Sequence, residues 1–331
     1  MQECRRPVGL RAWLVLICLL GLIAVGGVRL TAAEPIRLQL QWQPQAQFAG
    51  YITAKDRGFF AKAGLDDVQL QWATDGSRPL ERLAQGKADF CTSWLSDGIV
   101  ERADGNPVVL ISKIIPHSSM TLVVRADSDI KKPADMTGRR VGLWGGPFDI
   151  PPTALFKKYA VRPITVPQSS SMVPFLRGAV DVASAMQYNE YHELLEAGMR
   201  PKELRVFLLA DYGIDFPEDG LYCTQATRRD RPKVCAAMVR AIDQGWAYAL
   251  SHEDETLDLV MKHCREANVK TNRNHQRWML RAMGRIIETG QKRVGLSEKT
   301  YDSVTGILLG EALISTIPAF NEFYQPPLPK N

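Results

Sequence analysis

Two stretches of this 331-residue chain align with each other: Gly86-Lys-Ala-Asp-Phe-Cys-Thr-Ser-Trp94 and Gly178-Ala-Val-Asp-Val-Ala-Ser-Ala-Met186. Each begins at a glycine suited to end a short helix and passes through an aspartate into a predicted strand. The second stretch follows the first by 92 residues, a spacing that suits one lobe for each copy. The alternative is one continuous doubly wound sheet, which is disfavoured because about 300 residues is the upper size of a single domain.

The segments before each stretch also follow a common order. The first set of expected elements is strand 36–42, helix 49–63, strand 68–72, helix 79–85 and strand 89–92. The second set is strand 140–144, helix 153–160, strand 163–166, helix 172–177 and strand 181–184. Strands that alternate with helices indicate βαβ units and mostly parallel sheets. We therefore expect an α/β protein whose first lobe comprises 34–120 plus 225–331, and whose second lobe comprises 121–224.

The N-terminal 33 residues differ from the rest of the chain. They contain four of the arginines and one glutamate, so they carry much of the net charge of +5. A basic start, an uncharged stretch at 12–28 and the small residues Thr31-Ala-Ala33 are typical of a cleaved secretory signal. An N-terminal membrane anchor is the alternative, because the uncharged stretch is at the short limit for a spanning helix. The remaining body is nearly neutral, which argues against a nucleic-acid binder.

The cysteines and histidines show no pattern of a catalytic or metal centre. No C-x-x-C pair, G-x-S-x-G or H-E-x-x-H motif is present, and the histidine spacing is too irregular to predict a metal site. For the body cysteines, one disulfide and buried free thiols both stay open. These cysteines are Cys91, Cys223, Cys235 and Cys264.

Aromatic residues follow four of the predicted strands. Ligands of open α/β sheets bind outside the carboxyl ends of the strands, so these residues would line one cleft between two facing lobes. Aromatic walls with nearby amides suit a flat heteroaromatic guest, although core packing is the alternative for each aromatic alone. The strand-end residues are Trp42, Trp94, Trp144 and Tyr188, accompanied by Gln45 and Phe48 after the first strand.

Polar groups at the same strand ends complete the predicted site. Glu190 could accept hydrogen bonds from an amine or a protonated ring nitrogen, or could be a solvated glutamate in the first turn of a helix. Gly145 and Gly146 precede a helix and could bind an oxyanion through backbone N–H groups. Asp219 either contacts the ligand or shapes a turn.

The segments 40–51 and 57–66, LQWQPQAQFAGY and RGFFAKAGLD, resemble the thiamine-pyrimidine-precursor-binding family. Its members are periplasmic solute-binding proteins of ABC transporters, and they are also similar to the fungal pyrimidine synthase. The likeness continues through GNPVV, GRRVG, WGG, YNEY and EDGLY, so it covers most of residues 36–225.

The resemblance implies a two-lobed periplasmic binding protein of type II with a hinge between the lobes. The implied ligand is an aminopyrimidine with a hydroxymethyl, aminomethyl or formylaminomethyl group, and the implied partner is an ABC transporter permease. Trp42 would lie beside the ring, Glu190 would bind its amino edge and Tyr188 would form a wall. Gln45, Phe48 and Pro147 depart from the residues common in the family, which leaves the substituent open.

The same resemblance leaves two alternatives. The fungal cysteine-rich motif and a convincing pyridoxal-lysine context are missing, which favours a binding protein without catalysis, metal or cofactor over a pyrimidine synthase. A binding protein for another small solute, such as a sulfonate or nitrate, is the second alternative. We expect membrane contact only through the leader or the permease.

Overall fold

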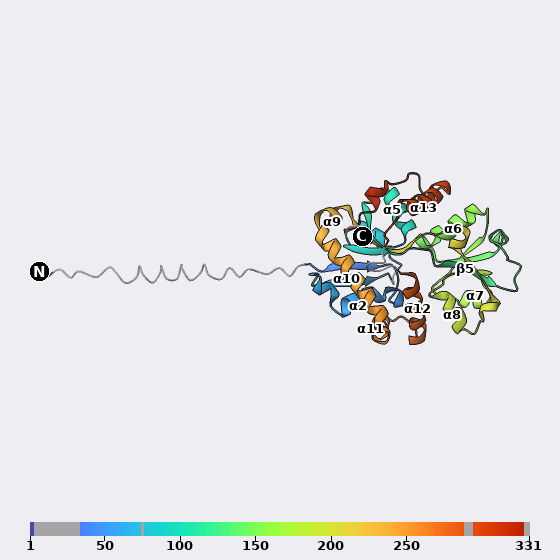
Figure 1. The fold of residues 1–331 in the computed structure, drawn as a ribbon, viewed down its shortest axis with the longest axis horizontal. Helices are drawn as coiled ribbons and strands as arrows, with labels where there is room; N and C mark the ends of the chain where they lie inside the picture. Colours follow the sequence, from blue (N-terminus) through green and yellow to red (C-terminus); the bar gives the residue numbers. More distant parts are fainter. Residues whose placement is uncertain (3–33, 74–75, 288–293, 328–331) are drawn as a thin grey trace. The chain divides into compact units, whose positions relative to one another are not determined.

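Two five-stranded sheets flanked by helices organise the chain in this computed structural model (Figure 1). The first sheet has the order β2-β1-β3-β10-β4 and the second β7-β6-β8-β5-β9. In each of these orders the first three strands are parallel to one another. The fourth strand, β10 or β5, runs antiparallel to the strands on both sides of it. The predicted two-lobed α/β fold with mostly parallel sheets is therefore confirmed.

The strands of the first sheet are β1 (Ile36–Leu40), β2 (Val68–Trp72), β3 (Phe90–Ser93), β4 (Val108–Ile115) and β10 (Glu218–Thr224). Those of the second sheet are β5 (Met120–Arg125), β6 (Arg140–Leu143), β7 (Ile164–Pro167), β8 (Val182–Met186) and β9 (Leu204–Leu208). The two aligned stretches, 86–94 and 178–186, contain β3 and β8. Each of these strands is the third in the order of its sheet.

The structure describes residues 1–2, 34–73, 76–287 and 294–327, and divides the chain into the units Met1–Glu34 and Pro35–Asn331. The predicted leader lies almost wholly outside the described residues. Among the helices that are described, none is both long and apolar enough to cross a membrane.

The aspartates of the two aligned stretches make the same contacts in both lobes. The Arg37 backbone N–H donates to Asp89 Oδ2 at 2.8 Å, and the Arg37 guanidinium lies 3.1 Å from the same oxygen. The Arg140 backbone N–H donates to Asp181 Oδ2 at 2.9 Å, and this guanidinium also pairs with the carboxylate. Each aspartate thus ties the start of one strand to the start of its neighbour.

The chain passes between the lobes twice, at 116–119 and at 209–217. The expected second lobe, 121–224, is wrong at its end, because β10 pairs with β3 and β4 in the first sheet. The local sequence of β10 does not determine which strands it pairs with, because this depends on segments distant in the chain. At the start of β10, Glu218 accepts hydrogen bonds from Ser119 N–H at 2.7 Å and from Ser118 Oγ at 3.1 Å, so it joins the two crossings.

Helices cover both faces of each sheet (Figure 1). On the second lobe they are α6 (Ile150–Lys158), α7 (Val173–Leu176) and α8 (Glu190–Glu196). On the first lobe they are α2 (Ala49–Asp56), α3 (Phe59–Lys62), α4 (Pro79–Ala84), α5 (Leu95–Ala103), α9 (Gln225–Asp230), α10 (Pro232–Ser251), α11 (Glu253–Glu266), α12 (Arg273–Ile286), α13 (Glu298–Gly310) and α14 (Phe320–Phe323). The expected helix 49–63 is split, because Gly58 adopts a left-handed conformation with φ of 72°.

The longest helix, α10, packs on α2 through small residues. A Cβ added to Gly245 would lie 2.0 Å from the Gly50 carbonyl oxygen, so only glycine allows this approach of the two backbones. Trp246, the next residue, is fully buried and lies against Gly50. Met238 and Ile242, which precede Trp246 on the same side of α10, are buried as well.

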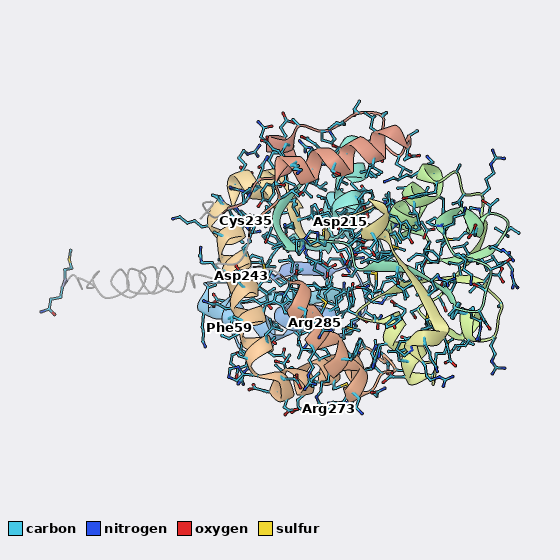
Figure 2. All side chains as sticks on the ribbon, turned by 45° about the vertical axis from the view of Figure 1, so that its right-hand side comes forward. Phe59, Asp215, Cys235, Asp243, Arg273 and Arg285 are labelled. Atoms are coloured by element: carbon cyan, nitrogen blue, oxygen red, sulfur yellow. The ribbon has the colours of Figure 1, made fainter. Side chains whose placement is uncertain are left out.

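All four described cysteines are free and buried. Cys235 lies on α10 (Figure 2), and its Sγ atom is 4.0 Å from Sγ of Cys223. The sequence leaves open one disulfide or four free thiols, and the structure has free thiols.

Candidate functional site

A narrow cavity of about 30 Å³ lies between the two lobes. Its walls come from the loops that follow β1, β3, β6 and β8, at the carboxyl ends of these strands. The first lobe contributes Gln41, Trp42, Gln45, Gln47 and Trp94, and the second lobe contributes Trp144, Phe148, Met186, Tyr188, Asn189 and Glu190.

Phe148 is the centre of the aromatic part of the cavity wall. Its ring lies edge-on to Trp42, Trp94 and Trp144, with centroid separations of 5.4, 5.0 and 6.3 Å. The indole N–H groups of Trp94 and Trp144 are buried and have no hydrogen-bond partner among the described residues. Since an unpaired buried donor is costly, these two groups are available to an acceptor on a ligand.

Glu190 provides the carboxyl group of the cavity. It is the first residue of α8 and only 3% exposed. The Met186 backbone N–H donates to its Oε2 at 2.8 Å, and the Asn189 amide donates to its Oε1 at 2.7 Å. Burial nevertheless raises the pKa of Glu190 to about 7, so this carboxyl exchanges a proton near neutral pH.

Asp219 lies behind the wall of the cavity and orients two of its amides. It is buried, with φ of 49°, and accepts hydrogen bonds from the side chains of Gln41 and Gln47. Gln47 accepts in turn from Gln45 Nε2 at 2.7 Å. Burial raises the pKa of Asp219 to about 6. Asp219 therefore acts on the cavity through the glutamines, which fix where amide donors and acceptors face a guest.

The structure brings most of the predicted residues to one cavity. Those that line it are Trp42, Gln45, Trp94, Trp144, Tyr188 and Glu190. Gly145 and Gly146 line a neighbouring hollow instead, and the N–H of Gly145 already donates to the Asp149 carboxylate at 2.8 Å. An oxyanion at that N–H would compete with a carboxylate of the chain itself.

Phe48 is placed differently from the prediction. It is fully buried in the first lobe, 6.2 Å from Tyr51 and 5.8 Å from Trp72 between ring centroids. The short helix Ala46–Phe48 turns the chain so that Gln45 and Gln47 face the cavity and Phe48 enters the core. Phe48 lies three residues after the predicted contact Gln45, and this spacing alone does not determine which way a side chain points in a helical turn.

Sequence reasoning missed five lining residues: Gln41, Gln47, Phe148, Met186 and Asn189. Gln41 and Gln47 lie in the segment 40–51 and Asn189 lies in YNEY, so the signal for these three was their position after a strand rather than their type. Met186 is the last residue of β8 and is indistinguishable from a core residue by pattern. Phe148 follows Pro147, and its approach to the tryptophans of the other lobe depends on how the lobes face each other.

Residues 45–256 match the sequence family described as NMT1/THI5 like. The chain belongs to this family. The match includes segments of both lobes. It contains all residues that line the cavity except Gln41 and Trp42, which precede it. The family resemblance expected from the sequence is thereby confirmed.

Two curated relatives carry different activities. The formylaminopyrimidine-binding protein of Halalkalibacterium halodurans is 26% identical over 247 residues, which are 72% of this chain and 73% of that protein. The 4-amino-5-hydroxymethyl-2-methylpyrimidine phosphate synthase of Uromyces fabae is 26% identical over 227 residues, or 65% of this chain and 66% of the synthase. The family therefore includes both a binding protein and an enzyme.

Solved structures share the fold. The periplasmic aliphatic sulphonate binding protein SsuA of Escherichia coli superposes with a TM-score of 0.65 at 14% identity, covering 88% of this chain and 92% of that chain. This similarity extends over both lobes, in agreement with the two-lobed binding-protein architecture expected from the sequence.

Proposed function

We propose that this protein is the solute-binding component of an ABC transporter and that it captures a thiamine-type aminopyrimidine between its lobes. Glu190 is the observation that carries the proposal, since it places a buried carboxyl group in an otherwise aromatic and amide-lined cavity. The formylaminopyrimidine-binding relative supports the ligand class. The fold supports a role outside the cytoplasmic membrane, with a membrane permease as partner.

An aminopyrimidine matches the chemistry of Glu190. Its amino group is a donor and the adjacent ring nitrogen takes up a proton, so this edge forms two hydrogen bonds with one carboxyl group. The complex then contains one proton, shared between the carboxyl and the ring nitrogen. The aromatic side chains around Phe148 supply contacts for the ring faces, and Gln41 and Gln47 are within the same wall to bind a polar substituent.

Closure of the lobes follows from the two-sided cavity. Trp42 and Trp94 belong to the first lobe, whereas Phe148 and Glu190 belong to the second. A ligand that contacts both sets binds the closed arrangement better than an open one, and this difference in affinity drives closure. We propose the segments 116–119 and 209–217 as the hinge.

An anion such as a sulfonate or nitrate fits this cavity less well. The described residues that line it include one carboxyl group and no cation. The nearest arginine of the adjoining hollow, Arg78, is already paired with Glu101 at 2.7 Å and faces Asp97 at 3.7 Å. An anionic ligand would therefore meet Glu190 without a compensating charge.

Calorimetry on the purified protein tests the ligand, with the hydroxymethyl, aminomethyl and formylaminomethyl forms of the aminopyrimidine and with an alkanesulfonate. We expect heat from at least one aminopyrimidine and none from the sulfonate. Trp42→Ala should weaken binding by about tenfold or more, whereas Trp72→Ala, outside the cavity, should leave it unchanged. If none of the three aminopyrimidines gives heat of binding at millimolar concentration, the proposed ligand class is rejected.

Native mass spectrometry distinguishes binding from synthesis. A binding protein releases its aminopyrimidine unchanged, whereas the synthase alternative, which the Uromyces fabae relative represents, converts bound precursors during incubation. A covalent adduct on a lysine, or product formed from added pyridoxal phosphate, would favour the enzyme.

A further inference from the structure

Three potential metal ligands meet where α8 of the second lobe lies beside α12 of the first (Figure 1). His192 and Glu196 are one helical turn apart on α8, and His275 comes from α12, the helix that begins at Arg273 (labelled in Figure 2). His192 Nδ1 is 3.1 Å from His275 Nδ1, which is 3.3 Å from Glu196 Oε2. All three ligand atoms lie within 4.8 Å of one another.

The hydrogen bonds around His275 determine which of its nitrogens carries the proton. The Asn189 amide nitrogen donates to Glu190, so the Asn189 oxygen is the atom that faces His275 Nε2 at 2.8 Å. His275 Nε2 must therefore be the N–H donor, which leaves a lone pair on Nδ1 of the neutral ring. This lone pair faces both His192 Nδ1 and Glu196 Oε2, so it points to the place where the three ligand atoms meet.

We propose that His192, Glu196 and His275 form a site for a divalent transition metal ion of the zinc class. Two imidazoles and one carboxylate with an open fourth position are a common zinc ligand set. Tetrahedral bonds of about 2.0–2.1 Å place ligand atoms about 3.3 Å apart, close to the measured separations of 3.1 and 3.3 Å. No change of helix position is needed to bring the ligands together.

The surroundings of the three ligands fit this assignment. Asn189 accepts from the second nitrogen of His275, as outer groups commonly do for metal-bound histidines. The ring of His192 stacks on Trp278 with a centroid separation of 4.4 Å, which fixes its orientation. Asn272 donates to Glu196 Oε1 at 3.2 Å and to Oε2 at 3.5 Å, which holds the carboxylate beside His275.

The metal would join the two lobes, because its ligands come from both of them. It would also lie next to the cavity, since Asn189 contacts His275 on one side and Glu190 on the other. The site itself does not depend on which solute the cavity binds, so metal binding can be tested without the pyrimidine.

Titration of the chelator-treated, untagged protein with Zn²⁺ and Co²⁺ tests the proposal. We expect one equivalent to bind and to raise the melting temperature. Glu196→Gln and His192→Gln should weaken binding by about 100-fold, whereas His252→Gln, an exposed histidine between α10 and α11, should bind like the original protein. Since Glu196 is partly exposed, its substitution leaves the fold intact, and circular dichroism verifies this for both variants.

The cobalt spectrum identifies the ligands. Nitrogen and oxygen ligands give only weak visible bands, whereas a thiolate adds strong absorption in the near ultraviolet. Such absorption would assign the metal to the Cys223–Cys235 pair and overturn the proposal. Unchanged binding in Glu196→Gln and His192→Gln, or no binding of either metal to the original protein, would equally reject it.

Discussion

Glu190 shows how position decides the chemistry of a single residue. From the sequence it could equally have been a solvated glutamate in the first turn of a helix. In the structure it does begin α8, but the same residue is buried and lines the cavity. Its two backbone and amide donors favour the ionised form, while burial favours the neutral one and raises its pKa to about 7.

The affinity for an aminopyrimidine should therefore depend on pH. The complex holds one proton between Glu190 and the ring nitrogen of the ligand. Below about pH 7, Glu190 of the free protein already carries this proton, whereas above pH 7 the proton must be taken up from solvent. We expect the affinity measured by calorimetry to fall by about tenfold per pH unit above pH 7.

Glu190→Gln should weaken binding by about 10- to 100-fold and abolish this pH dependence. The carboxylate now accepts hydrogen bonds from the Met186 N–H and the Asn189 amide. The NH₂ group of a glutamine would face one of these two donors and could not accept from it. Glu193→Gln, outside the cavity, should keep the affinity at low pH but lower the pH at which it starts to fall, because the charge of Glu193 contributes to the raised pKa of Glu190. A Glu190→Gln protein with full affinity and the same pH profile would remove Glu190 from the site.

At the scale of elements, the two crossings meet at a buried acid. Glu218 begins β10 and accepts from Ser118 and Ser119, but its Oε2 has no partner among the described residues. Burial, followed by repulsion from Asp219, raises the pKa of Glu218 well above its ordinary value. The folded protein thus binds a proton that the unfolded chain releases as the pH rises above 4.5.

Glu218→Gln should stabilise the protein at alkaline pH. The stability that protonated Glu218 contributes is fully present at low pH and is lost as the pH rises towards its folded pKa, whereas glutamine does not titrate. We expect the variant's gain in free energy of unfolding to be larger near pH 8 than near pH 5. Urea denaturation at both pH values measures it, with Glu266→Gln, an exposed position on α11, as the control.

The contact between α10 and α2 leads to a second prediction at this scale. Gly245→Ala places a methyl group against the Gly50 carbonyl, so we expect a loss of about 3 kcal/mol in the free energy of unfolding. Gly306→Ala on α13 meets nothing within 4 Å and should instead stabilise the protein by up to about 1 kcal/mol. Thermal denaturation compares them, and equal effects would show that the close approach is unimportant.

The elements that sequence reasoning missed share a physical cause. β4 (Val108–Ile115) is buried along its whole length, so it lacks the alternation that marks a half-buried strand. The metal ligands proposed here are equally invisible, since His275 lies on a different lobe from His192 and Glu196. Periodicity reports local structure, whereas these features depend on pairings between distant segments.

At the scale of the whole molecule, the two aligned stretches were enough to predict two lobes, because the stretches occupy equivalent positions in two similar sheets. Asp89 and Asp181 make the same contacts with Arg37 and Arg140, and the sheets have the same strand order. The aromatic strand ends also converge as expected. The facing of the lobes, and hence the place of Phe148, could not be predicted from either half alone.

The position of β10 has a consequence for how the chain folds. All strands of the second sheet lie within one continuous segment, from Met120 to Leu208. The first sheet is incomplete until β10, which arrives more than 100 residues after β4 begins, inserts between β3 and β4. Contacts between distant segments form slowly, so pulse-labelled hydrogen exchange should protect β5, β6 and β8 before β3 and β4. The first lobe begins at the N-terminus and is the last to be finished, and until then the chain has only half of its binding site.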